Sequence, residues 1–252
     1  MRKLAGAATC GLLLLLAAGC GGSDDAATET ATVAAPSEAT SSTTPSATSA
    51  DAAPAADKDA DQAIVDAALL KLDDFPSGWT GHPADDEDDD PEAWSCPGLD
   101  DLDGKTTAKG SSPDFENDSN EQVTESIAVF PDENLPHQFL SALGNQDFLD
   151  CMEDKVLDEI ESDASEEDVT LGDVKLSQLR VNDRGDESAA IRVAIPMEIQ
   201  GITLDAAVDV IAVRVGRSVL MLMTAGVMSP VSDADRENLT TVATKRLAAA
   251  MS

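Results

Sequence analysis

Aromatic and imidazole side chains are scarce in this sequence of 252 residues. It contains two tryptophans, five phenylalanines, no tyrosine and two histidines. Histidine is the most frequent general base in enzymes, and aromatic rings supply the flat apolar faces on which sugar-cleaving enzymes hold their substrates. The shortage of both residue types argues against a glycosidase and against catalysis by histidine.

Positive charge is also in short supply. Lysine and arginine together number 16, against 49 aspartates and glutamates, which gives a formal net charge of −33. A chain this acidic is repelled by nucleic acid phosphates and by anionic lipid headgroups. We therefore expect no nucleic acid partner, and any attachment to a membrane has to come from a lipid chain rather than from a basic surface.

The apolar run near the N-terminus is too short to span a bilayer. It covers residues 5–16 and follows Arg2 and Lys3, whereas a membrane span needs ~20 residues. A short apolar region behind a few positive charges is typical of a signal peptide. The residues that follow, LAAGC at 16–20, resemble the lipobox of bacterial lipoproteins.

The lipobox resemblance implies that the Cys20 thiol carries a diacylglyceryl group and that cleavage occurs just before it. Residues 1–19 are then a lipoprotein signal peptide, and fatty acyl chains of the palmitate type anchor the protein at the outer face of the cytoplasmic membrane. Two acyl chains at one residue suffice for stable anchoring. The alternative is an ordinary secretory signal in which Cys20 is incidental.

Residues 20–60 have the composition of a tether. Residues 21–60 are mostly Ala, Ser, Thr, Asp and Pro, with no aromatic residue and Val33 as the only branched aliphatic residue. Such a segment cannot form a packed core, and as a flexible chain it would reach roughly 35 Å. Residues 61–252 are long enough for one domain with its own core.

The cysteines in the rest of the chain predict one disulfide. Cys10 leaves with the signal peptide and Cys20 is lipidated, so Cys96 and Cys151 remain. Two cysteines in an exported domain favour a disulfide. A zinc or iron–sulfur site is the weaker alternative, because there is no CxxC spacing and only two histidines could contribute.

Hydrophobic periodicity predicts an α+β domain, with an antiparallel β-meander packed against helices. Helices are expected over 61–72, from Pro136 to a break at Gly144, and then in a segment with Phe148, Met152, Val156 and Ile160 on one side. A last helix follows a capping box of Ser232 and Asp235. Strands are expected over 121–130, 174–181, 189–199, 203–215 and 218–227, and hairpin turns join the last four.

Two details refine the expected sheet. The segments 203–215 and 218–227 are apolar on both faces near their middles, which indicates central strands. Pro196 lacks an N–H, so its strand is expected to be an edge strand or to be bulged at that residue.

The order of these features resembles that of actinobacterial surface lipoproteins. This order of features is similar to that of the extracellular sensor domain of the kinase PknH and its stand-alone lipoprotein relatives: the signal, the tether, LLKLDDFPSGW at 69–79, Cys96, Cys151 and the strand-rich C-terminal half. The resemblance implies an antiparallel sheet flanked by helices that form a ligand-binding cleft. It transfers no ligand-binding residue to this chain.

Two groups of residues are candidates for binding. Asp114, Glu116, Asp118, Asn120 and Glu125 have the spacing of positions 1, 3, 5, 7 and 12 of a calcium loop, although Ser119 stands where that loop has glycine. The alternative is a solvated acidic loop. Trp79 and Trp94 flank the acidic run at 85–90, and they either line a ligand cleft or pack in the core.

We therefore expect a membrane-anchored ligand-binding or sensor-like module without cofactor or catalytic activity, whose ligand is a small molecule or an envelope protein. The serine nucleophile motifs G-x-S-x-G and S-x-x-K do not occur in a usable context. The alternatives are a cell-envelope hydrolase that uses a carboxylate pair, and a cation-binding structural protein of the surface.

Overall fold

The computed structural model describes residues 57–84, 96, 105–166, 169–228 and 230–252. The predicted signal peptide, Cys20, nearly all of the predicted tether and Trp94 lie outside these residues, and the predictions made for them stay predictions.

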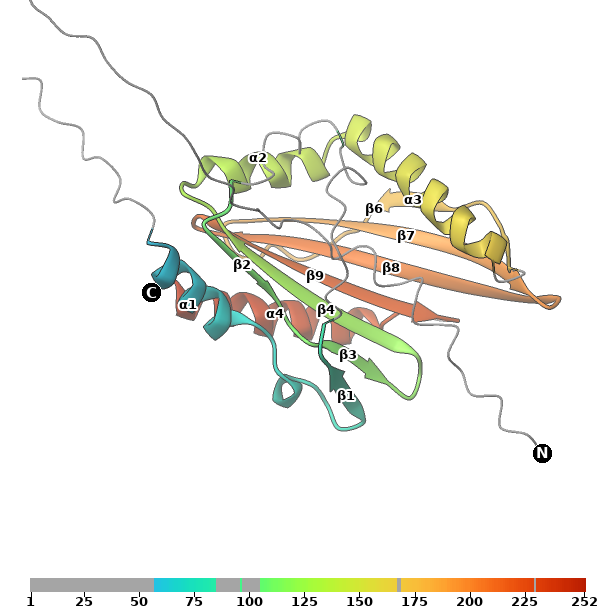
Figure 1. Ribbon diagram of the computed structural model, residues 1–252, viewed down its shortest axis with the longest axis horizontal. Helices are drawn as coiled ribbons and strands as arrows, with labels where there is room; N and C mark the ends of the chain where they lie inside the picture. Colours follow the sequence, from blue (N-terminus) through green and yellow to red (C-terminus); the bar gives the residue numbers. More distant parts are fainter. Residues whose placement is uncertain (1–56, 85–95, 97–104, 167–168, 229) are drawn as a thin grey trace, which may run out of the picture.

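An antiparallel sheet of nine strands forms the centre of the domain (Figure 1). Its main order is β1-β3-β4-β9-β8-β7-β5, while β2 also pairs with β4 and β6 with β7. The α+β class and the antiparallel arrangement predicted from the sequence are confirmed. The strands are β1 (Trp79–His82), β2 (Ala108–Ser111), β3 (Asp114–Asn117), β4 (Glu121–Val129), β5 (Val169–Leu171), β6 (Lys175–Gln178), β7 (Glu187–Ile199), β8 (Ile202–Val215) and β9 (Ser218–Val227).

The three longest strands form the predicted meander. Gln200 and Gly201 connect β7 to β8 with φ angles of 53° and 79°, as in the two-residue turns that match the twist of a hairpin. β8 pairs with β7 on one side and with β9 on the other, and β9 continues to β4. β8 and β9 are therefore central strands, as their apolar faces predicted.

Pro196 lies at an interruption of the sheet rather than at its edge. β5 and β6 both pair with the same side of β7, and Pro196 falls between the two pairings. The Pro196 carbonyl accepts a hydrogen bond from the Gly172 N–H at 2.7 Å. Because the nitrogen and the carbonyl of a strand residue face the same side, the Pro196 nitrogen, which carries no hydrogen, also faces this gap. The proline therefore costs the sheet no ladder bond.

Helices cover both faces of the sheet, so the domain has three layers (Figure 1). α2 (Asn134–Leu143) and α3 (Gln146–Glu166) lie on one face, called the upper face here, and α1 (Lys58–Ala68) and α4 (Asp233–Ala250) lie on the lower face. Each face has its own core. The upper core includes Leu140, Phe148, Met152, Val156, Ile191, Val193 and Ile195, and the lower core includes Val65, Phe115, Ile127, Ile211, Leu220, Leu222, Leu239 and Leu247.

The first helix differs from its prediction at both ends. Asp57 caps it by accepting hydrogen bonds from the N–H groups of Asp59 and Ala60, and it ends at Ala68 instead of residue 72. Leu69 adopts an extended conformation, and a short 3-10 helix, η2 (Leu72–Asp74), follows. The early end has a tertiary cause, because the Leu70 N–H is bound by a side chain of the sheet. The Ser232 cap of α4 was predicted correctly.

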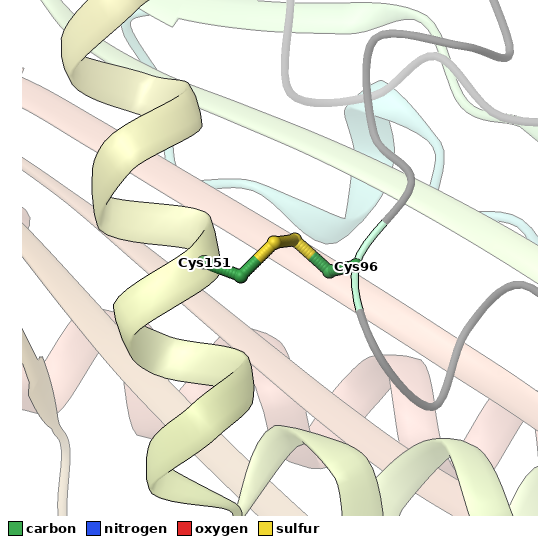
Figure 2. Close-up of a disulfide and its surroundings, with 2 residues drawn as sticks. All are labelled: Cys96 and Cys151. Atoms are coloured by element: carbon green, nitrogen blue, oxygen red, sulfur yellow. A yellow bond between two sulfur atoms is a disulfide. The ribbon is translucent and has the colours of Figure 1, made fainter.

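The predicted disulfide is confirmed (Figure 2). It joins Cys96 to Cys151 of α3, with 5.9 Å between the two Cα atoms. Cys96 is completely buried and belongs to the upper core. The bond therefore attaches the chain at residue 96 to the upper layer.

Candidate ligand-binding face

The helices of the upper layer lie over one part of the sheet. α2 packs on β7 and β8, and α3 packs on β5 and β6. Several upper-face side chains of β4 and β9 are only half-buried, whereas Val219 and Ala225, on the same face of β9, are buried in the upper core. We call the half-buried set of residues the open face: Gln122, Thr124, Ser126, Ala128, Met221 and Met223.

β3 and β1 extend the open face with polar side chains. The Thr124 hydroxyl donates a hydrogen bond to Asp114 Oδ1 at 2.8 Å, and Glu116 pairs across the strands with Gln122. At the sheet edge, His82 Nε2 lies 3.1 Å from Glu116 Oε1. The open face thus changes from carboxylate and hydroxyl groups at the edge to methionine thioethers near the middle, which adapt readily to different apolar shapes.

The five candidate calcium ligands do not surround one point. Asp114 and Glu116 point to the upper face from β3, and Glu125 points to the lower face from β4. Residues 114–125 form a hairpin whose strand periodicity of two sends these carboxylates to opposite faces. Asp118 and Asn120 lie in its turn. The described part of the chain contains no cluster of three or more His, Cys, Asp or Glu that could hold a metal ion.

Trp79 lies on the lower face, away from the open face. Its ring centroid is 5.0 Å from that of Phe75, and Phe75 is 4.2 Å from Phe115, a fully buried residue of the lower core. Trp79 therefore packs against the core, which is one of the two alternatives that the sequence left open. The other member of the pair, Trp94, is outside the described residues.

The contacts of the two histidines do not build a nucleophile–base pair. His82 uses the same ring nitrogen, Nε2, for Glu116 and for Thr80 Oγ1. A catalytic histidine needs one nitrogen for the nucleophile and the other for the carboxylate that orients it. His137 Nδ1 contacts both carboxylate oxygens of Glu187, at 2.8 and 2.9 Å, and this hydrogen bond is the main cause that lowers the pKa of Glu187.

The lower layer contains a buried ion cluster that the sequence reasoning missed. Asp209 of β8 accepts two hydrogen bonds from Arg192 of β7, at 2.6 and 2.7 Å, and one from Arg236 of α4 at 2.8 Å. Arg236 also bonds the exposed Asp233. The sequence contained a signal for this cluster, because Asp209 interrupts the apolar residues on the face of β8 that points into the core. The cluster fastens α4 to the sheet and has a structural role.

A second ion pair attaches α1 to the sheet. Asp61 is buried and accepts hydrogen bonds from Arg217, at the turn between β8 and β9, and from Thr107. The Arg217 hydrogen bond is the main cause that lowers the pKa of Asp61. Val65, one turn further along α1, packs so closely on Gly110 of β2 that a Cβ there would lie 2.8 Å from its side chain. α1 is therefore an integral part of the domain.

No protein-family model and no curated protein sequence matches this chain. Similar solved structures include the extracellular domain of PknH from Mycobacterium tuberculosis, with a TM-score of 0.39, 10% identity, and coverage of 79% of this chain and 99% of that chain. LpqN from Mycobacterium tuberculosis, a protein involved in cell envelope biogenesis, gives a TM-score of 0.28, 12% identity, and coverage of 67% and 75%.

A third solved structure, the protein PA94 from Pseudomonas aeruginosa, gives a TM-score of 0.19 with 14% identity, and covers 56% of this chain and 78% of its own. The PknH-type domain that the order of sequence features resembles is thus found again among the solved structures. At these TM-scores and identities the likeness carries no argument about fold or function.

Proposed function

We propose that this chain is a lipid-anchored extracytoplasmic module that binds a ligand on its open face and acts as a sensor-like domain. The lipobox at 16–20 supports the anchor, and the disulfide between Cys96 and Cys151 fits an oxidising compartment. No helix in the described ranges is long and apolar enough to cross a membrane. The observation that carries the proposal is the open face itself, a set of half-buried side chains on β4 and β9, while the described helices α2 and α3 pack on β5 to β8.

The side chains of the open face define the kind of ligand. Met221 and Met223 offer apolar, flexible contacts, while Thr124 and Gln122 offer hydrogen bonds. Asp114 and Glu116 at the edge disfavour an anion. A neutral or cationic amphipathic molecule, or a segment of an envelope protein with this chemistry, fits the combination.

The anchor is tested by replacing Cys20. We expect Cys20→Ala to move the protein from the membrane fraction into the medium, because one thiol is the only proposed attachment point for lipid. Fractionation of cells followed by immunoblotting measures this. Cys10→Ala, which lies inside the predicted signal peptide, should leave the protein on the membrane. If the Cys20→Ala protein also stays on the membrane, the proposed anchor is wrong.

The ligand site is tested with a charge on the open face. We expect the protein isolated from its own cells to retain a small molecule or a peptide, detected by native mass spectrometry. Met223→Glu should lower the retained fraction at least about tenfold, because the loss of one buried apolar contact costs about 1.5–3 kcal/mol.

Met228→Glu is the matched control for Met223→Glu. Met228 is 66% exposed and lies just after β9, so a glutamate there should leave retention unchanged. Equal loss in both variants would show that added charge, rather than the open face, decides retention. Bare protein in all samples would contradict a tightly held ligand.

A further inference from the structure

Glu125 is a completely buried carboxyl group in the lower core. It lies on β4 between Thr124 and Ser126, which belong to the open face, and its own side chain points to the opposite face. Its Oε2 accepts a hydrogen bond from the Leu70 N–H at 2.5 Å, and its Oε1 has no hydrogen-bond partner among the described residues. This contact is the one that ends α1 early.

The charged groups that face Glu125 do not form an ion pair with it. Arg246 of α4 donates hydrogen bonds to the carbonyls of Ala68 and Ala67, at 3.1 and 3.3 Å, and lies 3.3 Å from Asp74 of η2. Its guanidinium therefore caps the C-terminal end of α1 and neutralises Asp74.

Two further described neighbours of Glu125 carry no charge. From the end of β2, the Ser112 hydroxyl accepts a hydrogen bond from the Glu125 N–H at 3.0 Å. From β9, the residue paired with Glu125 is the apolar Leu222. A carboxylate ion at this position would thus be buried without a cation of its own.

Burial is the main cause that raises the pKa of Glu125, to about 8. The hydrogen bond from Leu70 and the charge of Arg246 lower this pKa by less, and the charge of Asp74 raises it further. A buried carboxyl group without an ion-pair partner is expected to be neutral for the same reason, since desolvation disfavours its charged form.

We propose that Glu125 is a proton-operated latch for residues 69–75, the segment that leads from α1 through η2. The neutral carboxyl group stays buried and holds Leu70 against β4. When it loses its proton, the charged group is stable only in water, so the segment opens locally while the sheet stays folded. The latch lies between the N-terminal end of the domain and the strand that carries the open face. This inference is independent of the proposed ligand and lipid anchor.

The pH range of the latch follows from linkage. In the open state the Glu125 side chain is in water and has its ordinary pKa of 4.5, against about 8 when it is buried. Between these two values opening releases a proton, so the opening constant rises about tenfold for each pH unit. Below pH 4.5 and above about pH 8 the opening constant does not change with pH. Acid therefore closes the latch, and a rise from pH 5 to pH 8 increases the opening constant by about a few hundredfold.

The test is amide hydrogen exchange of the full mature chain between pH 5 and pH 9, with rates corrected for base catalysis. We expect protection of the amides of residues 69–75 to fall steeply up to pH 8 and then to level off. Glu125→Gln should remove the pH dependence, because glutamine carries no charge at any pH. Glu121→Gln, which changes another carboxyl group of β4 that bonds the Asn117 side chain, should keep the original profile.

A second measurement keeps the proposal testable if the Glu125→Gln protein does not fold. The carboxyl carbon of Glu125 can be titrated by NMR in the unchanged protein. A midpoint near 4.5 would overturn the latch, and so would a raised midpoint together with protection that does not depend on pH. A raised midpoint with pH-dependent protection confined to residues 69–75 would support it.

Discussion

Asp209→Ala is expected to destabilise the protein by about 3–5 kcal/mol, because it leaves the buried Arg236 cation with only the exposed Asp233 as a partner. The side chain of Arg236 is only 4% exposed and donates to Asp209 Oδ2. Arg192 is 28% exposed and can regain water, so most of the loss comes from Arg236. Urea denaturation followed by circular dichroism measures the change in free energy of unfolding.

Asp233→Ala is the matched control for Asp209→Ala. Asp233 bonds the same arginine at 2.9 Å, but its side chain is 86% exposed, and exposed pairs contribute between 0 and about 1 kcal/mol. We expect the two variants to differ by at least about 2 kcal/mol, the gap between these two ranges. Similar values for both would mean that burial of the Asp209–Arg236 pair does not fasten α4 to the sheet.

The disulfide is expected to contribute about 4 kcal/mol, the chain-entropy value for closing a loop of this size. The two cysteines are 55 residues apart. The double change Cys96→Ser and Cys151→Ser removes the bond, and the loss is measured by urea denaturation under oxidising conditions. The fully buried position of Cys96 adds a further cost, because a serine hydroxyl there replaces a sulfur in an apolar core.

Reduction provides the control for the disulfide. The unchanged protein should lose a similar free energy of unfolding when a reductant is added, whereas the double serine variant should not respond to it. A loss below about 1 kcal/mol in both experiments would contradict the chain-entropy estimate. It would indicate that residue 96 is held in the upper core by packing alone.

Local residue patterns were sufficient to predict the C-terminal half. Strict alternation at residues 191–197 and apolar character on both sides of β8 and β9 follow from strand geometry, and Gln200–Gly201 has the composition of a two-residue turn. The capping serine of α4 and the disulfide also depend on few residues. Such features are decided within a hairpin, a helical turn or a pair of cysteines, so they can be predicted without knowledge of the whole fold.

The position of each side chain relative to distant segments could not be predicted in this way. The spacing of Asp114 and Glu125 fits a calcium loop, but the predicted strand at 121–130 pairs with β3 as a hairpin, and the two carboxylates point to opposite faces. The end of α1 at Ala68 depends on Glu125, a residue far along the chain.

The amino-acid order was therefore enough for the class of the domain, for the strands β4 and β6 to β9 and for the covalent cross-link, but not for the short strands β1, β2, β3 and β5. The placement of β9 beside β4, the two helical layers and the charges buried beneath α1 and α4 arise from contacts between remote segments. Their stability depends on packing and on desolvation of whole surfaces, which no local pattern encodes. The open face and the buried Glu125, on which both functional proposals rest, belong to this second group.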